Sequence, residues 1–158
     1  MIKMVRTPTY NYNFNTRSGY FERWGTSFED DPQFSPIGPE LADIEISTIC
    51  NNNCPHCYKS NTSIGQNMSL ETFEKVLDKL PKSILQIAFG IGNLDANPDT
   101  FKIFELCRER GIVPNVTISS NDRITFSEFA SLAVTCGAIA ISNYDKKRCY
   151  TAVCLLSQ

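Results

Sequence analysis

Cys50-Asn51-Asn52-Asn53-Cys54-Pro55-His56-Cys57 is the stretch that decides how the rest of this sequence is interpreted. It places three thiols at a C-x3-C-x2-C spacing, directly after an apolar, strand-like run that ends at Ile49. Thiolates are soft ligands that select iron–sulfur clusters, zinc or Cu(I). Three neighbouring cysteines can hold three corners of a [4Fe–4S] cube. Because full protein ligation takes four, one iron would remain open to a small molecule.

At these residues the sequence resembles the radical S-adenosylmethionine (SAM) superfamily. Its members carry C-x3-C-x-Φ-C, with Φ usually aromatic, on the loop after the first strand of a partial (β/α) barrel. The resemblance implies that Cys50, Cys54 and Cys57 ligate a [4Fe–4S] cluster, with His56 at position Φ of the cofactor site. It also implies that SAM chelates the fourth iron, and that reductive cleavage of SAM yields a 5′-deoxyadenosyl radical. The protein would then be an enzyme whose radical abstracts hydrogen from a substrate that the sequence does not name.

Other uses of the three thiols stay open, although seven cysteines in 158 residues would give this spacing by chance with a probability of only about 0.01. Structural zinc takes four protein ligands, and His56 abuts Cys57 too closely to join the same site readily. The alternative function is a non-catalytic α/β binding module stabilised by zinc or by an iron–sulfur cluster. A Cys/His hydrolase fits poorly because His56 is the only histidine. Cys107 stands alone in a helix-like segment, so we expect it to act as a buried small hydrophobe.

Composition limits the setting of this chemistry. The net charge of −2 gives no signal for nucleic acid, and no apolar run approaches the length of a membrane span. The cysteine count is odd and the N-terminus has no apolar signal core, so the sequence favours a reducing cytoplasm. Reduction of a sulfonium needs a cluster of low potential, so the resemblance implies an external electron donor such as a flavodoxin or a ferredoxin.

The sequence divides near residue 40. Residues 1–40 mix aromatic and polar residues without a sustained period, which predicts an irregular N-terminal extension whose aromatics pack against the core. Residues 41–158 repeat a strand, loop and helix pattern, which predicts an α/β fold with a parallel sheet. By the resemblance this is a radical SAM core, a partial TIM-like barrel with about four of the usual six βα units. The sheet edge left by the absent units indicates a fragment of a longer protein, which we favour, a dimer through that edge, or an edge covered by the N-terminal segment.

The predicted elements follow from apolar periodicity and from capping residues. The expected helices begin at Ser69, at Asn97 as N-cap with Pro98 at N1, and at the capping-box pattern of Thr125 and Glu128. Gly111 should end the second helix. The expected strands are 43–48, 84–89, 113–118 and 138–142, and a fourth helical segment is expected over 146–156.

Polar residues and glycines follow these strands, and the loops after parallel strands gather at one end of the sheet. The resemblance places SAM beside the segment after the second strand, where this sequence has Gly90, Gly92 and Asn93, the last in place of a more usual Glu. Asp95 becomes a substitute acceptor for the SAM ammonium. The same resemblance makes Ser119, followed by Ser120 and Asn121, and Ser142 candidates for polar contacts to the cofactor or substrate.

Overall fold

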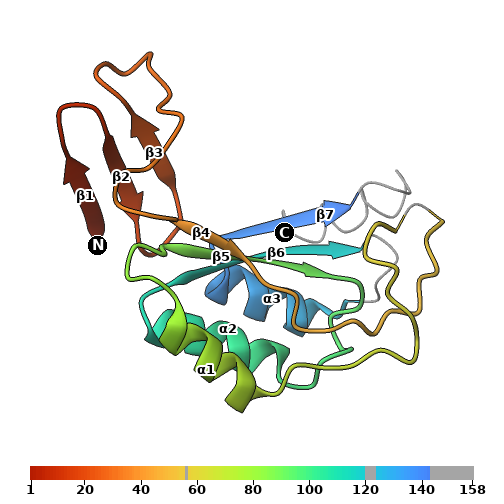
Figure 1. Cartoon of the computed structure of the whole chain (residues 1–158). Helices are drawn as coiled ribbons and strands as arrows, with labels where there is room; N and C mark the ends of the chain where they lie inside the picture. The colour runs from red at the N-terminus through yellow and green to blue at the C-terminus, as the bar shows by residue number, and fades with distance from the viewer. Residues whose placement is uncertain (56, 120–123, 143–158) are drawn as a thin grey trace.

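The computed structural model describes residues 1–55, 57–119 and 124–142 of the chain (Figure 1). His56, Ser120, Asn121 and the segment expected to be helical over 146–156 lie outside the described residues. In the part that is described, two sheets and three helices form in the order shown in Figure 1. None of these helices combines the length and the apolar character needed to cross a membrane.

The larger sheet is parallel, as the alternating pattern predicts. Its four strands lie in chain order, and each pairs in parallel with the next: β4 (Leu41–Asp43), β5 (Gln86–Ile91), β6 (Val113–Ser119) and β7 (Ala138–Ser142). Three helices alternate with them: α1 (Leu70–Lys79), α2 (Thr100–Glu109) and α3 (Phe126–Thr135). All three helices lie on one face of the sheet (Figure 1). The α/β class is therefore confirmed, whereas closure toward a barrel stays a prediction.

The main core lies between this sheet and its helices. Along β5 the side chains alternate, so that Ile87 and Phe89 are fully buried while Ala88 and Gly90 face the other way. The Phe89 ring packs against Phe73 of α1 at 5.9 Å and against Phe104 of α2 at 5.0 Å, measured between centroids. Burial of such rings contributes about 1.5–3 kcal/mol each, which makes this layer a main source of stability. The opposite face of the sheet is consequently free to carry small and polar side chains.

Two helix starts agree with the capping predictions and one differs. Ser69 caps α1 through a bond from Thr72 N, and Thr125 with Glu128 forms the full capping box of α3. The prediction of Asn97 as N-cap of α2 is wrong, because the N-cap is Asp99. Asn97 is instead buried, and its amide donates to the backbone oxygens of two preceding segments.

The first parallel strand is also shorter than predicted. It ends at Asp43. Ile44 N still donates to Ala88 O of β5 at 3.0 Å, and the expected strand residues after it leave the sheet. Their backbone pairs with the returning chain instead: Thr48 N donates to Gln66 O at 2.9 Å, and Cys50 N donates to Thr62 O at 2.9 Å. The cysteine segment therefore belongs to a loop that folds back on itself, and it is not a simple continuation of β4.

The prediction of an irregular N-terminal extension is wrong for residues 2–24. They form an antiparallel sheet of three strands, β1 (Ile2–Arg6), β2 (Asn11–Asn15) and β3 (Phe21–Trp24). The alternation of apolar and polar residues in β2 was missed in the sequence. Tyr12 and Phe14 alternate with asparagines, and asparagines are also typical of loops. Residues 25–40 contain no helix or strand, and the division of the chain near residue 40 stays a prediction.

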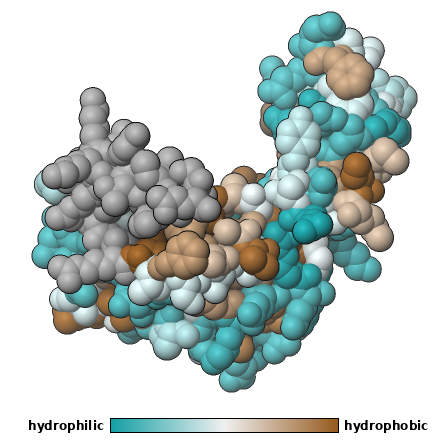
Figure 2. Space-filling view, turned by 180° about the vertical axis from the view of Figure 1, so that it is seen from behind, coloured by the Kyte–Doolittle hydropathy of each residue, from teal (hydrophilic) through white to brown (hydrophobic). Residues whose placement is uncertain are grey.

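The N-terminal sheet packs against the amino ends of the parallel strands (Figure 1). Buried aromatics on one of its faces contact two residues of the larger unit, as predicted for these aromatics: Tyr10, Tyr12 and Phe14 pack with Leu85 and Val113. The guanidinium of Arg108, on α2, donates to the backbone oxygens of Thr16 at 2.8 Å and Arg17 at 3.1 Å. From behind, the N-terminal sheet rises beside the body of the molecule (Figure 2). The N-terminal sheet therefore lies at the end of the parallel strands opposite to their carboxyl ends.

Candidate functional site

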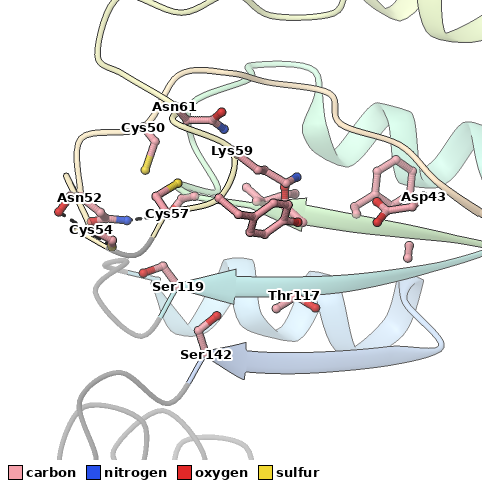
Figure 3. A pocket seen from close by; sticks show the side chains of 16 residues that line it. Asp43, Cys50, Asn52, Cys54, Cys57, Lys59, Asn61, Thr117, Ser119 and Ser142 are labelled. Atoms are coloured by element: carbon pink, nitrogen blue, oxygen red, sulfur yellow. Dashed lines mark hydrogen bonds between the residues drawn. The ribbon is translucent and has the colours of Figure 1, made fainter.

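A cavity of about 270 Å³ lies at the carboxyl ends of β5, β6 and β7 (Figure 3). Residues from the cysteine loop, the exposed face of the sheet and the strand ends line it: Asp43, Cys50, Asn52, Cys54, Cys57, Tyr58, Lys59, Asn61, Ala88, Phe89, Gly90, Ile91, Gly92, Thr117, Ser119 and Ser142. The three cysteines of the C-x3-C-x2-C stretch therefore share one cavity. Clefts at this end of parallel sheets are where such folds bind ligands.

Asparagine side chains fasten the cysteine loop to the segment after β5. Asn51 N donates to Asn93 Oδ1 at 2.9 Å, and Asn52 Nδ2 donates to Gly92 O at 2.9 Å. Asn53 has a φ of 45°, in the left-handed region that Asn tolerates better than most residues. The run of three asparagines thus serves the loop's conformation and its attachment. These contacts account for the asparagines without any contact to a cofactor.

The side chain of Cys50 packs so closely against Gly92 that this position has no room for a Cβ. A Cβ at this position would lie 2.5 Å from Cys50 Sγ and 2.9 Å from Cys50 Cβ, closer than real Cβ atoms approach. Cys50 is buried, so it has little room to retreat. The family resemblance places SAM beside this segment. In the structure, the group that approaches Gly92 most closely is a side chain of the cysteine loop itself.

The thiol of Cys57 differs in pKa from the two described thiols of the core. Backbone hydrogen bonds from Asn61 and Lys59 lower the pKa of Cys57, and the positive charge of Lys59 adds a smaller effect in the same direction. Burial raises the pKa of Cys107 and of Cys136 to about 12. Thiolates are the form that binds metals, so Cys57 is better suited to ligation than Cys107 or Cys136. Cys107 is fully buried, as predicted for a small hydrophobe.

The three thiols that line the cavity are a donor set that a [4Fe–4S] cube can use, because a cube takes one thiolate on each of several irons. Among the described residues, which do not include His56, no group of three His, Cys, Asp or Glu side chains is arranged to hold a single metal ion. Residues Cys50, Cys54 and Cys57 are therefore the ones that would hold the cluster, and their ligation stays a prediction.

The other predicted cofactor residues separate into two groups. Gly90, Gly92, Ser119 and Ser142 line the cavity, and Ser119 pairs with Ser142 in register at the ends of β6 and β7 (Figure 3). Asn93 and Asp95 are not among its lining residues. Asn93 holds the cysteine loop through Asn51 N, and Asp95 is exposed in the following turn.

Several lining residues were not predicted from the sequence. Asp43 and Thr117 reach the cavity from β4 and β6, on the sheet face away from the helices. The alternation along each strand could have indicated this, since Thr117 lies between the buried residues Val116 and Ile118. Lys59 could not have been found by periodicity, because it lies on an irregular loop. Its ammonium donates to Gly90 O at 3.2 Å and pairs with Glu45 at 3.3 Å.

Comparison with known proteins agrees with this geometry. The family model of the radical SAM superfamily matches residues 44–142. The match contains the cysteine loop, all three helices and the three strands whose ends border the cavity. No curated protein and no solved structure matches the chain. Since the family match extends over more than half of the sequence, the chain belongs to the radical SAM superfamily.

Proposed function

We propose that this protein is a radical SAM enzyme that holds a [4Fe–4S] cluster through Cys50, Cys54 and Cys57 and binds SAM in the adjoining cavity. When bound, the cluster would supply an electron for reductive cleavage of SAM to a 5′-deoxyadenosyl radical, which abstracts hydrogen from the substrate. Members of this superfamily are generally enzymes that bind such a cluster and SAM. The observation that supports the proposal most is that all three cysteines line one cavity at the carboxyl ends of the parallel strands.

In this proposal the residues around the cysteines hold and orient SAM. The hydroxyls of Ser119 and Ser142 lie at adjacent strand ends and offer polar contacts to its ribose or carboxylate. The carbonyl oxygens of Gly90 and Gly92 already accept bonds from Lys59 and Asn52. Each carbonyl has a second lone pair, which leaves capacity to accept from the SAM ammonium. Thr117 and Asp43 lie farther along the sheet face and would contact the substrate.

The proposed reaction also needs an electron donor of low potential, such as a flavodoxin or a ferredoxin. A reducing cytoplasm suits this function, because the five cysteines that the structure describes are all free thiols. β7 is the last strand of the parallel sheet in the described part of the chain, so a dimer through that edge belongs to the proposal as well.

Anaerobic reconstitution of the full chain with iron and sulfide tests the function. We expect a brown protein that cleaves SAM to methionine and 5′-deoxyadenosine when dithionite supplies electrons. Cys54→Ala should lose both the cluster and the cleavage. Cys136→Ala, at a buried thiol remote from the cavity lining, should keep both if it folds, as circular dichroism would verify.

Two outcomes would contradict the proposal. A colourless protein with one zinc per chain would support the non-catalytic binding module. A full cluster with SAM left intact would remove the catalytic assignment while leaving the cluster ligands in place.

A further inference from the structure

Lys59 is the one cationic side chain among the described residues that line the cavity. It follows Cys57 by two positions and extends across the cavity wall to β5, where its ammonium donates to Gly90 O at 3.2 Å. Only 18% of the side chain is exposed, against 68% for the lysine of the Lys75–Glu71 pair on α1. Charges shielded from water are screened less by salt than exposed charges. The ammonium of Lys59 therefore acts over a longer range inside the cavity than an ordinary surface lysine would.

Gly90 provides the space that Lys59 occupies. A Cβ on Gly90 would lie 3.0 Å from Lys59 Nζ and 3.6 Å from Lys59 Cε. A side chain larger than glycine would thus push the ammonium back by a few tenths of an ångström. The two glycines at the carboxyl end of β5 therefore accommodate different side chains: Gly90, in the strand, accommodates Lys59, and Gly92, just after it, accommodates Cys50.

Glu45 fixes the other side of the ammonium. One of its carboxylate oxygens lies 3.3 Å from Lys59 Nζ and accepts a bond from Asn61 Nδ2 at 2.9 Å. Asn61 Nδ2 also lies 3.4 Å from Ser47 O. Lys59 and Asn61 flank the end of the cysteine loop, and Glu45 lies just before its beginning. The ion pair therefore joins the two ends of the loop. It places the positive charge of Lys59 where it acts on Cys57, and the Glu45 carboxylate partly neutralises that charge.

We propose that Lys59 is a positioning residue that raises the reduction potential of the cluster, and that Glu45 opposes it. This inference rests on the proposed function, since it concerns the cluster that the three cysteines would hold. Thiolate ligands give such a cluster site an excess of negative charge, and adding an electron increases that excess. A nearby ammonium stabilises the reduced form, and a nearby carboxylate destabilises it. The pair would thereby set how strong an electron donor the protein requires.

The test is a redox titration of the reconstituted protein without SAM, with the reduced fraction followed by electron paramagnetic resonance. Lys59→Met should lower the ratio of reduced to oxidised cluster about tenfold at a fixed ambient potential, which is 59 mV for a one-electron couple. Glu45→Gln should shift the ratio in the opposite direction, and its amide oxygen can still accept from Asn61. Lys59→Arg should restore a ratio near that of the wild type. Lys75→Met and Glu71→Gln, at the exposed pair on α1, are the matched controls and should change nothing.

The signs of the two shifts separate electrostatics from a purely structural role. If Lys59 and Glu45 only held the loop in place, both substitutions would lower cluster content, or shift the potential in the same direction. Either result, or unchanged potentials in both variants, would overturn the inference while leaving the cluster of the wild type intact. A wild-type protein that takes up no iron and sulfide would instead overturn the proposed function, and this inference with it.

Discussion

Replacement of Gly92 by alanine gives a direct test of how the site is built. The added Cβ would lie 2.5 Å from Cys50 Sγ, whereas carbon atoms in contact ordinarily lie about 3.5–4.0 Å apart. Cys50 would have to move by roughly 1 Å, although metal–ligand distances tolerate only about 0.2 Å. Cys50 N is also bonded to Thr62 O, which opposes such a movement. We expect Gly92→Ala to lose at least about tenfold in cluster affinity and about 1–3 kcal/mol in stability.

The assay measures iron and sulfide per chain after reconstitution with limiting iron, together with thermal unfolding. Two other glycines serve as controls. Gly90→Ala meets only the flexible end of Lys59, so its cluster content should stay near that of the wild type. Gly111→Ala has no steric contact within 4 Å but must adopt a φ of 72°, so it should lose about 1 kcal/mol of stability and keep its cluster. A Gly92→Ala protein with the iron content and melting temperature of the wild type would refute the reasoning.

Two further predictions concern the core. Asn97→Ala should destabilise the fold by about 3 kcal/mol, because the buried Asn97 amide donates to Ile46 O at 2.8 Å and to Met68 O at 2.9 Å, and unpaired buried carbonyls are costly. Urea unfolding measures the loss, and Asn67→Ala at an exposed amide should lose less than about 1 kcal/mol. The pKa of Cys107 is raised by burial from 9.0 to about 12, so the native state binds more protons than the unfolded state between these values. Stability should therefore fall as the pH rises from about 9 toward 12. The urea midpoint of Cys107→Ala should fall less over that range than the midpoint of the wild type, and equal slopes would contradict the assignment.

Local chemistry was strong enough to predict much of the larger unit. Helix caps need only residues three apart, so the start of α1 followed from the N-cap Ser69 and that of α3 from the capping box of Thr125 with Glu128. Gly111 ends α2 with a φ of 72°, as a glycine after a helix predicts. The strands β6 and β7 agree with their predicted ranges to within a residue.

The errors occur where distant residues decide the outcome. Asn97 has the side chain of an N-cap, but burial against Ile46 O and Met68 O gives its amide other partners. The N-terminal strands are too short and too polar to be recognised alone. They become a sheet because the Tyr12 and Phe14 side chains bury against Leu85 and Val113, some seventy or more positions away in the chain.

The sequence by itself determined the parallel α/β unit and the trio of cysteines, because periodicity, caps and ligand spacing act over a few residues. Only the tertiary structure decided which groups meet the cysteines: Lys59 beside Gly90, Cys50 against Gly92, and the serines at the ends of β6 and β7. These contacts join segments separated by more than twenty positions. The register and pleat of the sheet bring them together, and neither can be inferred from the local sequence.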